Sequence, residues 1–428
     1  KMIGDKRDER KAGTFNSPEH RAAALSVAEE SIVLLKNEKN ILPLNKKEVK
    51  SIAVIGANAD MRHSFGGGSA EIKALYEIAP LIGLKMYLGG NTKVTYNKGY
   101  YVATKALNAT ENWQATSLET GSDEMSEYPY LKLQKPGQYA KENETLFKEA
   151  LEAAKDADKV IFFGGLDHNY DIEGADRPDM KLPYDQDIII EKLLDVRPDT
   201  IIVLNGGSPV EMPWLDKADT LIYNYYAGME NGTALAKVIF GDVNPSGKLS
   251  ESFPYKYSDT VTYKNGEFSK DDCIEYKEGV FYGYRYYEKE GIDVAFPFGY
   301  GKSYTTFEYS DLTIKEVCTN ACEKEGCDSA LSVSLNVKNT GEVDGKEVVE
   351  IYVGENNPTV LRPVKELKGF EKVELKAGES KTVTVTIPKS RLGYYDDNIG
   401  AFVTNNGEYT VYACASSKDI RLKALVTL

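Results

Sequence analysis

The hydrophobic residues in the first part of the chain form short continuous runs, and helical spacing is found between these runs. The apolar runs, each followed by Gly or Asn, are 51–55, 159–163, 200–204 and 220–223. Helical spacing is found at about 144–157, 184–196 and 230–240. Continuous apolar strands that alternate with helices are typical of a parallel sheet covered on both faces. The pattern predicts an α/β domain whose ligand site lies past the carboxyl ends of its strands.

The segment before the first apolar run predicts a helix from Ser17 to Lys36. Ser17 is the expected N-cap, and Pro18 is suited to the first helical position. One face of this helix is apolar and is expected to pack on the sheet. Its residues are Leu25, Ala28, Ile32 and Leu35.

The pattern changes after about residue 325, where apolar and polar residues alternate. The alternation is clear at 331–337 and at 381–387, and turn residues follow at 339–341 and 376–378. Alternating runs separated by such turns predict an antiparallel β-sandwich that extends to the last residue. The polar stretch 103–145 has little periodicity and is predicted to be a long, functionally relevant excursion from the sheet.

Composition narrows the functional classes. A chain of 428 residues favours two or three domains. The net charge of −14 disfavours nucleic acids and anionic membranes as partners. No apolar run reaches about 18 residues, so no transmembrane helix is expected. The first residues show no signal peptide, which leaves the cellular location open, with the cytoplasm preferred to secretion.

Five cysteines form an odd set that argues against a disulfide framework. Cys318, Cys322 and Cys327 cluster, but their spacing does not match the paired CxxC pattern of a zinc site, and no histidine lies near them. We expect free thiols or one local disulfide at this cluster, and no bound metal.

Residue types that could take part in catalysis are concentrated in the loop after the strand that ends at Phe163. This loop contains the candidate acids Asp171, Glu173 and Asp176, together with glycines, a histidine and a tyrosine. Glycoside hydrolysis needs a carboxylic acid that protonates the leaving oxygen, and these acids are candidates. The alternative is a solvated acidic loop. A second glycine-rich stretch, 66–69, lacks both nucleotide-binding fingerprints and suits a tight turn.

A set of motifs resembles glycoside hydrolase family 3, specifically the part of those enzymes that follows their barrel domain. Each motif is weakly specific alone, but the ordered set is very specific. It covers nearly the whole chain, at 17–20, 32–37, 52–56, 66–70, 173–177, 182–183, 244–249, 278–287, 296–305 and 362–370.

The resemblance implies a mostly parallel α/β sandwich domain at 17–315, preceded by a linker at 1–16 and followed by an all-β fibronectin type III-like sandwich at 316–428. Carried over by motif, the acid/base of a retaining mechanism is Glu173, which directly precedes Gly-Ala-Asp-Arg, and Asp171 is the second choice. The other residues expected at the substrate site are His168, Tyr170, Arg177 and Ser69. No cofactor is implied.

The sequence departs from the family pattern because it contains no barrel domain, which would supply the aspartate nucleophile and most of the sugar contacts. We therefore expect one component of an exo-acting β-glucosidase that is inactive alone. The barrel would be a separate chain, or would have been cleaved or omitted. A β-xylosidase and a non-catalytic carbohydrate-binding or scaffolding protein are the alternatives. A homo-oligomer is compatible with the sequence.

Overall fold

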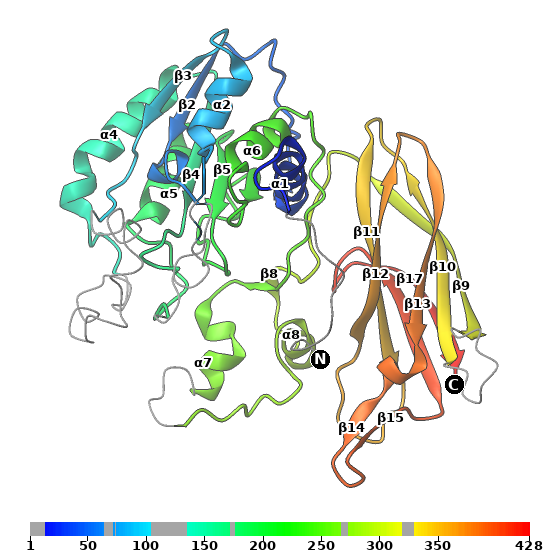
Figure 1. Cartoon of the computed structure of the whole chain (residues 1–428). Helices are drawn as coiled ribbons and strands as arrows, with labels where there is room; N and C mark the ends of the chain where they lie inside the picture. The colour runs from blue at the N-terminus through cyan, green and yellow to red at the C-terminus, as the bar shows by residue number, and fades with distance from the viewer. Residues whose placement is uncertain are drawn as a thin grey trace.

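The computed structural model describes residues 13–63, 72, 74–103, 135–171, 176–266, 273–318 and 329–428. Figure 1 shows an α/β layer structure beside an elongated β-sandwich, with the helices α7 (Val261–Asn265) and α8 (Tyr284–Glu290) below the sheet. The architecture is an α/β domain followed by an all-antiparallel β domain, which confirms the fold class predicted from the sequence.

The α/β domain is built on a six-stranded sheet in the order β1-β6-β5-β4-β2-β3. The five strands from β6 to β3 are parallel, and β1 pairs with β6 in the antiparallel direction. The strands are β1 (Val33–Asn37), β2 (Ser51–Ile55), β3 (Lys93–Asn97), β4 (Lys159–Gly165), β5 (Ile201–Asn205) and β6 (Thr220–Tyr223).

Helices cover both faces of this sheet, which explains why its central strands are apolar at every position. Alternate strand residues enter two separate cores, as Phe162 and Phe163 do. One core includes α4 (Ala140–Asp156) and α5 (Gln186–Val196). The other includes α1 (Pro18–Ser31), α2 (Pro80–Leu88) and α6 (Asn231–Ile239). In a sheet covered on both faces, ligands bind at the loops past the carboxyl ends of the strands, here the loops after β2, β4, β5 and β6.

The first predicted helix is wrong at its C-terminal end. Ser17 does cap α1, because its Oγ accepts a hydrogen bond from the backbone N–H of His20 at 3.4 Å. The helix ends at Ser31, however, and Val33–Asn37 forms the edge strand β1. Val33 is β-branched and, like Leu34 and Leu35, fully buried, so this run gains more by packing in both cores than by continuing the helix.

The C-terminal domain is a sandwich of a three-stranded sheet, β13-β10-β9, and a four-stranded sheet, β12-β11-β16-β17, with an added hairpin β14-β15. Its strands are β9 (Phe307–Cys318), β10 (Ser329–Asn339), β11 (Gly345–Glu355), β12 (Glu366–Leu375), β13 (Ser380–Pro388), β14 (Tyr394–Asp396), β15 (Ala401–Val403), β16 (Glu408–Cys414) and β17 (Ile420–Thr427). The expected boundary at 315/316 falls inside β9, which pairs with β10 from Phe307 onwards. We propose that the domain boundary lies just before Phe307.

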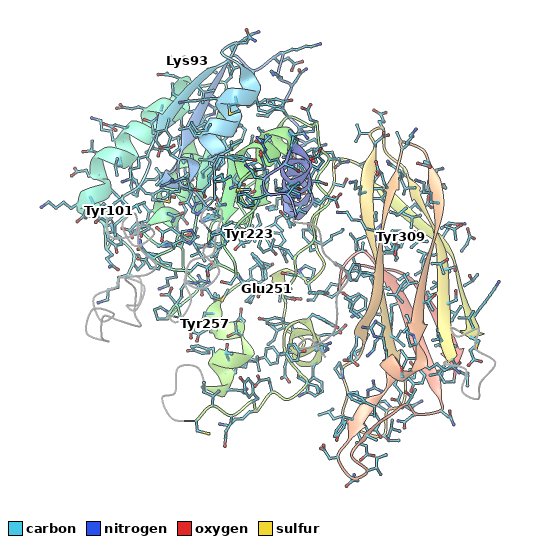
Figure 2. The ribbon with its side chains drawn as sticks, in the orientation of Figure 1. Lys93, Tyr101, Tyr223, Glu251, Tyr257 and Tyr309 are labelled. Carbon is cyan, nitrogen blue, oxygen red and sulfur yellow. The ribbon has the colours of Figure 1, made fainter. Side chains whose placement is uncertain are left out.

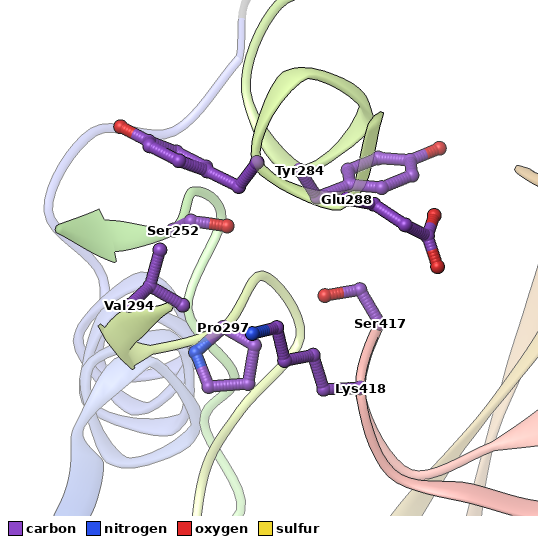
Figure 3. A pocket seen from close by; sticks show the side chains of 8 residues that line it. Ser252, Tyr284, Glu288, Val294, Pro297, Ser417 and Lys418 are labelled. Carbon is purple, nitrogen blue, oxygen red and sulfur yellow. The ribbon is translucent and has the colours of Figure 1, made fainter. Parts of the chain in front are cut away.

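The two domains are joined through α8 and the short pair β7 (Phe253–Pro254) and β8 (Val294–Phe296). The hydroxyl of Tyr284 on α8 accepts a hydrogen bond from the backbone N–H of Leu367 at 2.9 Å. The backbone N–H of Ser417 donates to the carbonyl of Phe298, also at 2.9 Å. Figure 3 shows a small cavity at this junction, lined by Tyr284 and Ser417 among others. It contains no residue of the loop after β4.

A buried carboxyl group at this junction gives a testable pH dependence. Glu350 on β11 is 4% exposed, and its Oε2 accepts a hydrogen bond from the hydroxyl of Tyr352 at 2.6 Å. Burial raises the pKa of Glu350 to about 7, against the effects of the Tyr352 hydrogen bond and of Lys248, and Glu347 raises it further. The unfolded chain ionises this group at a lower pH, so its contribution to stability is full below about pH 4.5 and is lost as the pH rises through 7.

The Glu350→Gln variant is expected to lack that loss. Between pH 4.5 and pH 8, the free energy of unfolding of the unsubstituted chain should fall by about 3 kcal/mol more than that of the variant. Urea unfolding of both proteins at several pH values measures the difference. Equal pH slopes for the two proteins would show that Glu350 does not titrate in this range.

Cys318 takes part in a disulfide, which agrees with one local disulfide at the cysteine cluster. The other two cysteines of that cluster lie outside the described residues. Within the described parts of the chain, no helix is long and apolar enough to cross a membrane.

Candidate functional site

The candidate site is built from the loops that follow β4, β5 and β6. Residues 166–171 continue directly from β4, and Asp171 reaches across to the other two loops. Figure 2 shows Tyr223, at the end of β6, and Glu251 on the side of the sheet that faces α7. These loops therefore lie at the carboxyl edge of the parallel strands, the edge at which the sequence pattern predicts a ligand site.

Asp171 connects all three loops through one carboxylate oxygen. Its Oδ2 accepts a hydrogen bond from the backbone N–H of Gly207, after β5, at 2.6 Å. The same oxygen accepts a hydrogen bond from the hydroxyl of Tyr226, after β6, at 2.9 Å. A carboxylate that accepts two short hydrogen bonds is held in one position.

Arg177 is held by the same segment that holds Asp171. Its Nη2 donates to the Oγ of Ser208 at 2.8 Å and to the carbonyl of Pro209 at 3.1 Å. The carbonyl of Ser208 accepts in turn from the hydroxyl of Tyr223 at 2.7 Å. Residues 207–209 therefore bind both Asp171 and Arg177.

Two buried histidines pack against Tyr226. The ring of His63, after β2, lies 5.7 Å from that of His168 and 5.6 Å from that of Tyr226. Burial, with a smaller effect from His168, lowers the pKa of His63 to about 3. Burial also lowers the pKa of His168, although Asp171 and Glu77 oppose this. The two imidazoles are therefore neutral packing partners at neutral pH.

The base of the site is a buried polar cluster around Asp167. Its Oδ2 accepts from the hydroxyl of Tyr184 at 2.9 Å, and its Oδ1 accepts from the backbone N–H of Asn169. Burial raises the pKa of Asp167 to about 6, although these hydrogen bonds favour the charged form. The ring of Tyr170 packs edge-on against Tyr184, at 5.2 Å between centroids, and Tyr170 is only 3% exposed. Tyr170 therefore belongs to the supporting core of this loop.

Glu251 adds a further acid near Arg177. Burial raises its pKa to about 7; Arg177 lowers it and Asp171 raises it. No chemical motif in its segment of the sequence points to this residue.

Of the six residues that the sequence selected, Asp171, His168, Tyr170 and Arg177 come together at the carboxyl edge. Glu173 and Ser69 lie outside the described residues, so their roles stay predictions. The selection missed His63, Gly207, Ser208, Tyr226 and Glu251. All but Glu251 follow sheet strands, so the position of these loops was the available signal.

The described residues contain no group of three or more His, Cys, Asp or Glu side chains that could hold a metal ion. The described part of the site offers carboxyl groups, hydrogen-bond donors and the guanidinium group of Arg177.

Comparison with known proteins shows to which family the chain belongs. Residues 32–304 match the glycosyl hydrolase family 3 C-terminal domain, and residues 347–417 match a fibronectin type III-like domain. The chain is 39% identical to thermostable β-glucosidase B of Acetivibrio thermocellus, over 96% of this chain and 49% of that protein. It is also 39% identical to β-glucosidase BoGH3A of Bacteroides ovatus, over 96% of this chain and 52% of the relative.

Solved structures agree with the sequence comparisons. DesR, a β-glucosidase from Streptomyces venezuelae solved in complex with D-glucose, superimposes with a TM-score of 0.83 at 30% identity, over 98% of this chain and 62% of that one. The β-glucosidase from Kluyveromyces marxianus superimposes with a TM-score of 0.82 at 30% identity, over 98% of this chain and 64% of that one. The chain spans about half the length of the two bacterial relatives above. It belongs to glycoside hydrolase family 3 and comprises the family's C-terminal domain together with the fibronectin type III-like domain.

Proposed function

We propose that this chain supplies the general acid/base of a retaining exo-β-glucosidase, and that the residue is Glu173. The observation that carries the proposal is the position of the loop: Glu173 follows Asp171 by two residues, and Asp171 and Arg177 are both fixed at the carboxyl edge of the sheet. The β-glucosidases among the relatives support glucose as the sugar.

In the proposed reaction, an aspartate of a barrel domain attacks the anomeric carbon, and Glu173 donates its proton to the departing glycosidic oxygen. The glycosyl–aspartate ester is then attacked by water, which Glu173, now ionised, deprotonates. The C–O bond to the aspartate breaks, glucose leaves with the β configuration, and Glu173 regains its proton. The negative charge of the aspartate nucleophile favours the protonated form of Glu173 before the first step.

The proposed function needs a partner domain, because an acid without the nucleophile and the sugar pocket lacks both covalent catalysis and positioning. The barrel can be in the same polypeptide or in a second one. Tests of the catalytic residues therefore use the complete enzyme, which we define as this chain together with its family 3 barrel domain.

The direct test compares the chain alone with the complete enzyme on an aryl β-glucoside and an aryl β-xyloside. We expect no appreciable hydrolysis by the chain alone, hydrolysis by the complete enzyme, and a higher kcat/KM for the glucoside. Proton NMR of the first product should show retained configuration. A preference for the xyloside would replace the glucosidase assignment with the xylosidase.

A non-catalytic carbohydrate-binding protein makes the opposite prediction. Isothermal titration of the isolated chain with cello- and xylo-oligosaccharides should detect no tight binding if the barrel supplies most of the sugar contacts. Tight binding by the isolated chain, with no activity in the complete enzyme, would favour the binding protein.

A further inference from the structure

We propose that Asp171 is a positioning residue that anchors the acid/base loop, and that it does not itself transfer a proton. This inference rests on the proposed function, because it concerns how the loop that carries Glu173 is held. It also answers which of the two acids is catalytic. Three sets of contacts support it: the hydrogen bonds of Asp171, the second anchor at Arg177, and the close packing of the segment that receives both.

The first set of contacts holds the carboxylate of Asp171. Both donors, the N–H of Gly207 and the hydroxyl of Tyr226, are directed at the single oxygen Oδ2. Two protein donors hold this oxygen in place, whereas a general acid must direct its carboxyl group at the leaving oxygen of the substrate. The hydrogen bonds of Asp171 therefore suit an anchor better than a proton donor.

The second set of contacts holds Arg177, so that the chain is anchored both before and after Glu173. Asp171 and Arg177 are six residues apart in the sequence, and they bind neighbouring residues of one segment, Gly207 and then Ser208 and Pro209. The chain that carries Glu173 therefore starts and ends at residues bound to the same segment.

The third set of contacts packs closely around the segment 206–209, which binds both anchors. A Cβ atom at Gly207 would lie 2.9 Å from the Oδ2 of Asp171, and one at Gly206 would lie 2.5 Å from the hydroxyl of Tyr223. The backbone can approach the carboxylate and the phenol this closely only because both positions are glycine. Tyr226, the second donor, is itself confined by the rings of His63 and His168.

The experiment compares Asp171→Ala with Asp171→Asn in the complete enzyme, on cellobiose and on 2,4-dinitrophenyl β-glucoside. Dinitrophenolate leaves without protonation, so only cellobiose depends on the acid. Alanine removes the anchor, and we expect kcat/KM for cellobiose to fall about 100-fold and that for the dinitrophenyl substrate much less. Asparagine keeps an oxygen that can accept both hydrogen bonds, and it should restore activity to within about tenfold of the parent enzyme.

Two further variants test the contacts of the anchor. Tyr226→Phe removes one donor and should lower kcat/KM for cellobiose about three- to tenfold, again with little effect on the dinitrophenyl substrate. Gly207→Ala places a methyl group against Oδ2 at an exposed position, so it displaces the carboxylate without threatening the fold. Asp216→Ala and Tyr263→Phe, at exposed positions away from this cluster, are the matched controls and should leave both substrates unaffected.

The outcomes separate this inference from the proposed function through Glu173→Ala, assayed in parallel. If Glu173→Ala loses cellobiose activity selectively but Asp171→Ala affects both substrates equally, the anchor is wrong and the acid/base assignment stands. If Asp171→Asn is as inactive as Asp171→Ala, Asp171 transfers the proton, and the anchor is wrong. If Glu173→Ala keeps its activity on cellobiose, both proposals fail.

Discussion

The Glu173→Gln variant of the complete enzyme should have a kcat/KM for cellobiose about 10²- to 10⁴-fold lower than that of the parent enzyme. This is the acceleration that a general acid provides when the leaving group is poor. The amide keeps the size of the side chain but has no acidic proton to give. The 2,4-dinitrophenyl glucoside should lose much less in kcat/KM, because its first step needs no acid. Initial rates on both substrates measure this difference directly.

The pH profile provides the control for that result. In the parent enzyme, kcat/KM for cellobiose should decrease at high pH as the acid ionises, and this basic limb should be absent in Glu173→Gln. A variant that lost both substrates equally would have lost its fold or its partner domain, and thermal unfolding distinguishes these cases. Full activity on cellobiose would contradict the assignment of Glu173.

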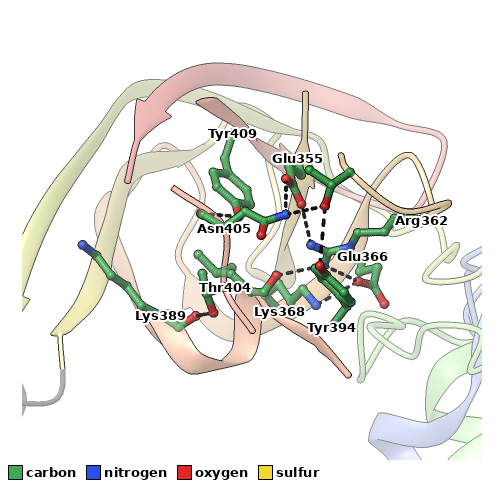
Figure 4. A network of polar contacts seen from close by, with 11 residues as sticks. Glu355, Arg362, Glu366, Lys368, Lys389, Tyr394, Thr404, Asn405 and Tyr409 are labelled. Carbon is green, nitrogen blue, oxygen red and sulfur yellow. Dashed lines mark hydrogen bonds and ion pairs between the residues drawn. The ribbon is translucent and has the colours of Figure 1, made fainter. Parts of the chain in front are cut away.

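The largest expected effect on stability comes from Arg362→Ala in the β-sandwich. The side chain of Arg362 is 9% exposed, and its Nη1 lies 2.8 Å from the Oε2 of Glu355, whose side chain is 5% exposed. Its Nη2 donates to the carbonyl of Leu392 at 2.8 Å, and Figure 4 shows Arg362 beside Glu355 and Glu366 in this network. Removing the arginine leaves the Glu355 carboxylate buried without its cation, so the free energy of unfolding should fall by about 3–5 kcal/mol.

Urea unfolding followed by circular dichroism measures this loss, and two variants control it. Arg391→Ala removes an exposed arginine from the adjoining turn and should change the free energy of unfolding by about 0.5 kcal/mol or less. Glu355→Gln added to Arg362→Ala removes the buried charge and should recover part of the loss. If Arg362→Ala cost no more than Arg391→Ala, the network in Figure 4 would not stabilise the domain.

Much of the fold could be predicted because its signals are local. The apolar run 159–163 and the alternating run 331–337 have the periodicities of a buried and a half-buried strand, and the structure has β4 and β10 there. The segment 33–37 was mispredicted because helical spacing and a short apolar run are ambiguous in isolation. Only the pairing of this segment with β6 decides that it is a strand.

The site was less predictable because its residues are distant in sequence. Asp171 could be selected from the acids after β4, but Gly207 and Tyr226 have no motif and meet Asp171 only because the carboxyl ends of three parallel strands lie side by side. Both residues lie in loops at that edge, so their position after parallel strands is the signal that points to them. Glu251 follows no strand of the sheet, and only the folded structure brings it near Arg177.

Azide rescue of Glu173→Ala in the complete enzyme tests the central claim most directly. With 2,4-dinitrophenyl β-glucoside, the variant should form the glycosyl–aspartate ester and then stall, because no base activates water. Azide needs no deprotonation, so it should attack the anomeric carbon, displace the aspartate and increase turnover about tenfold or more. The predicted product is β-glucosyl azide, with retained configuration. Rescue of Asp171→Ala instead of Glu173→Ala, or an unaffected Glu173→Ala variant that forms no azide product, would contradict the account.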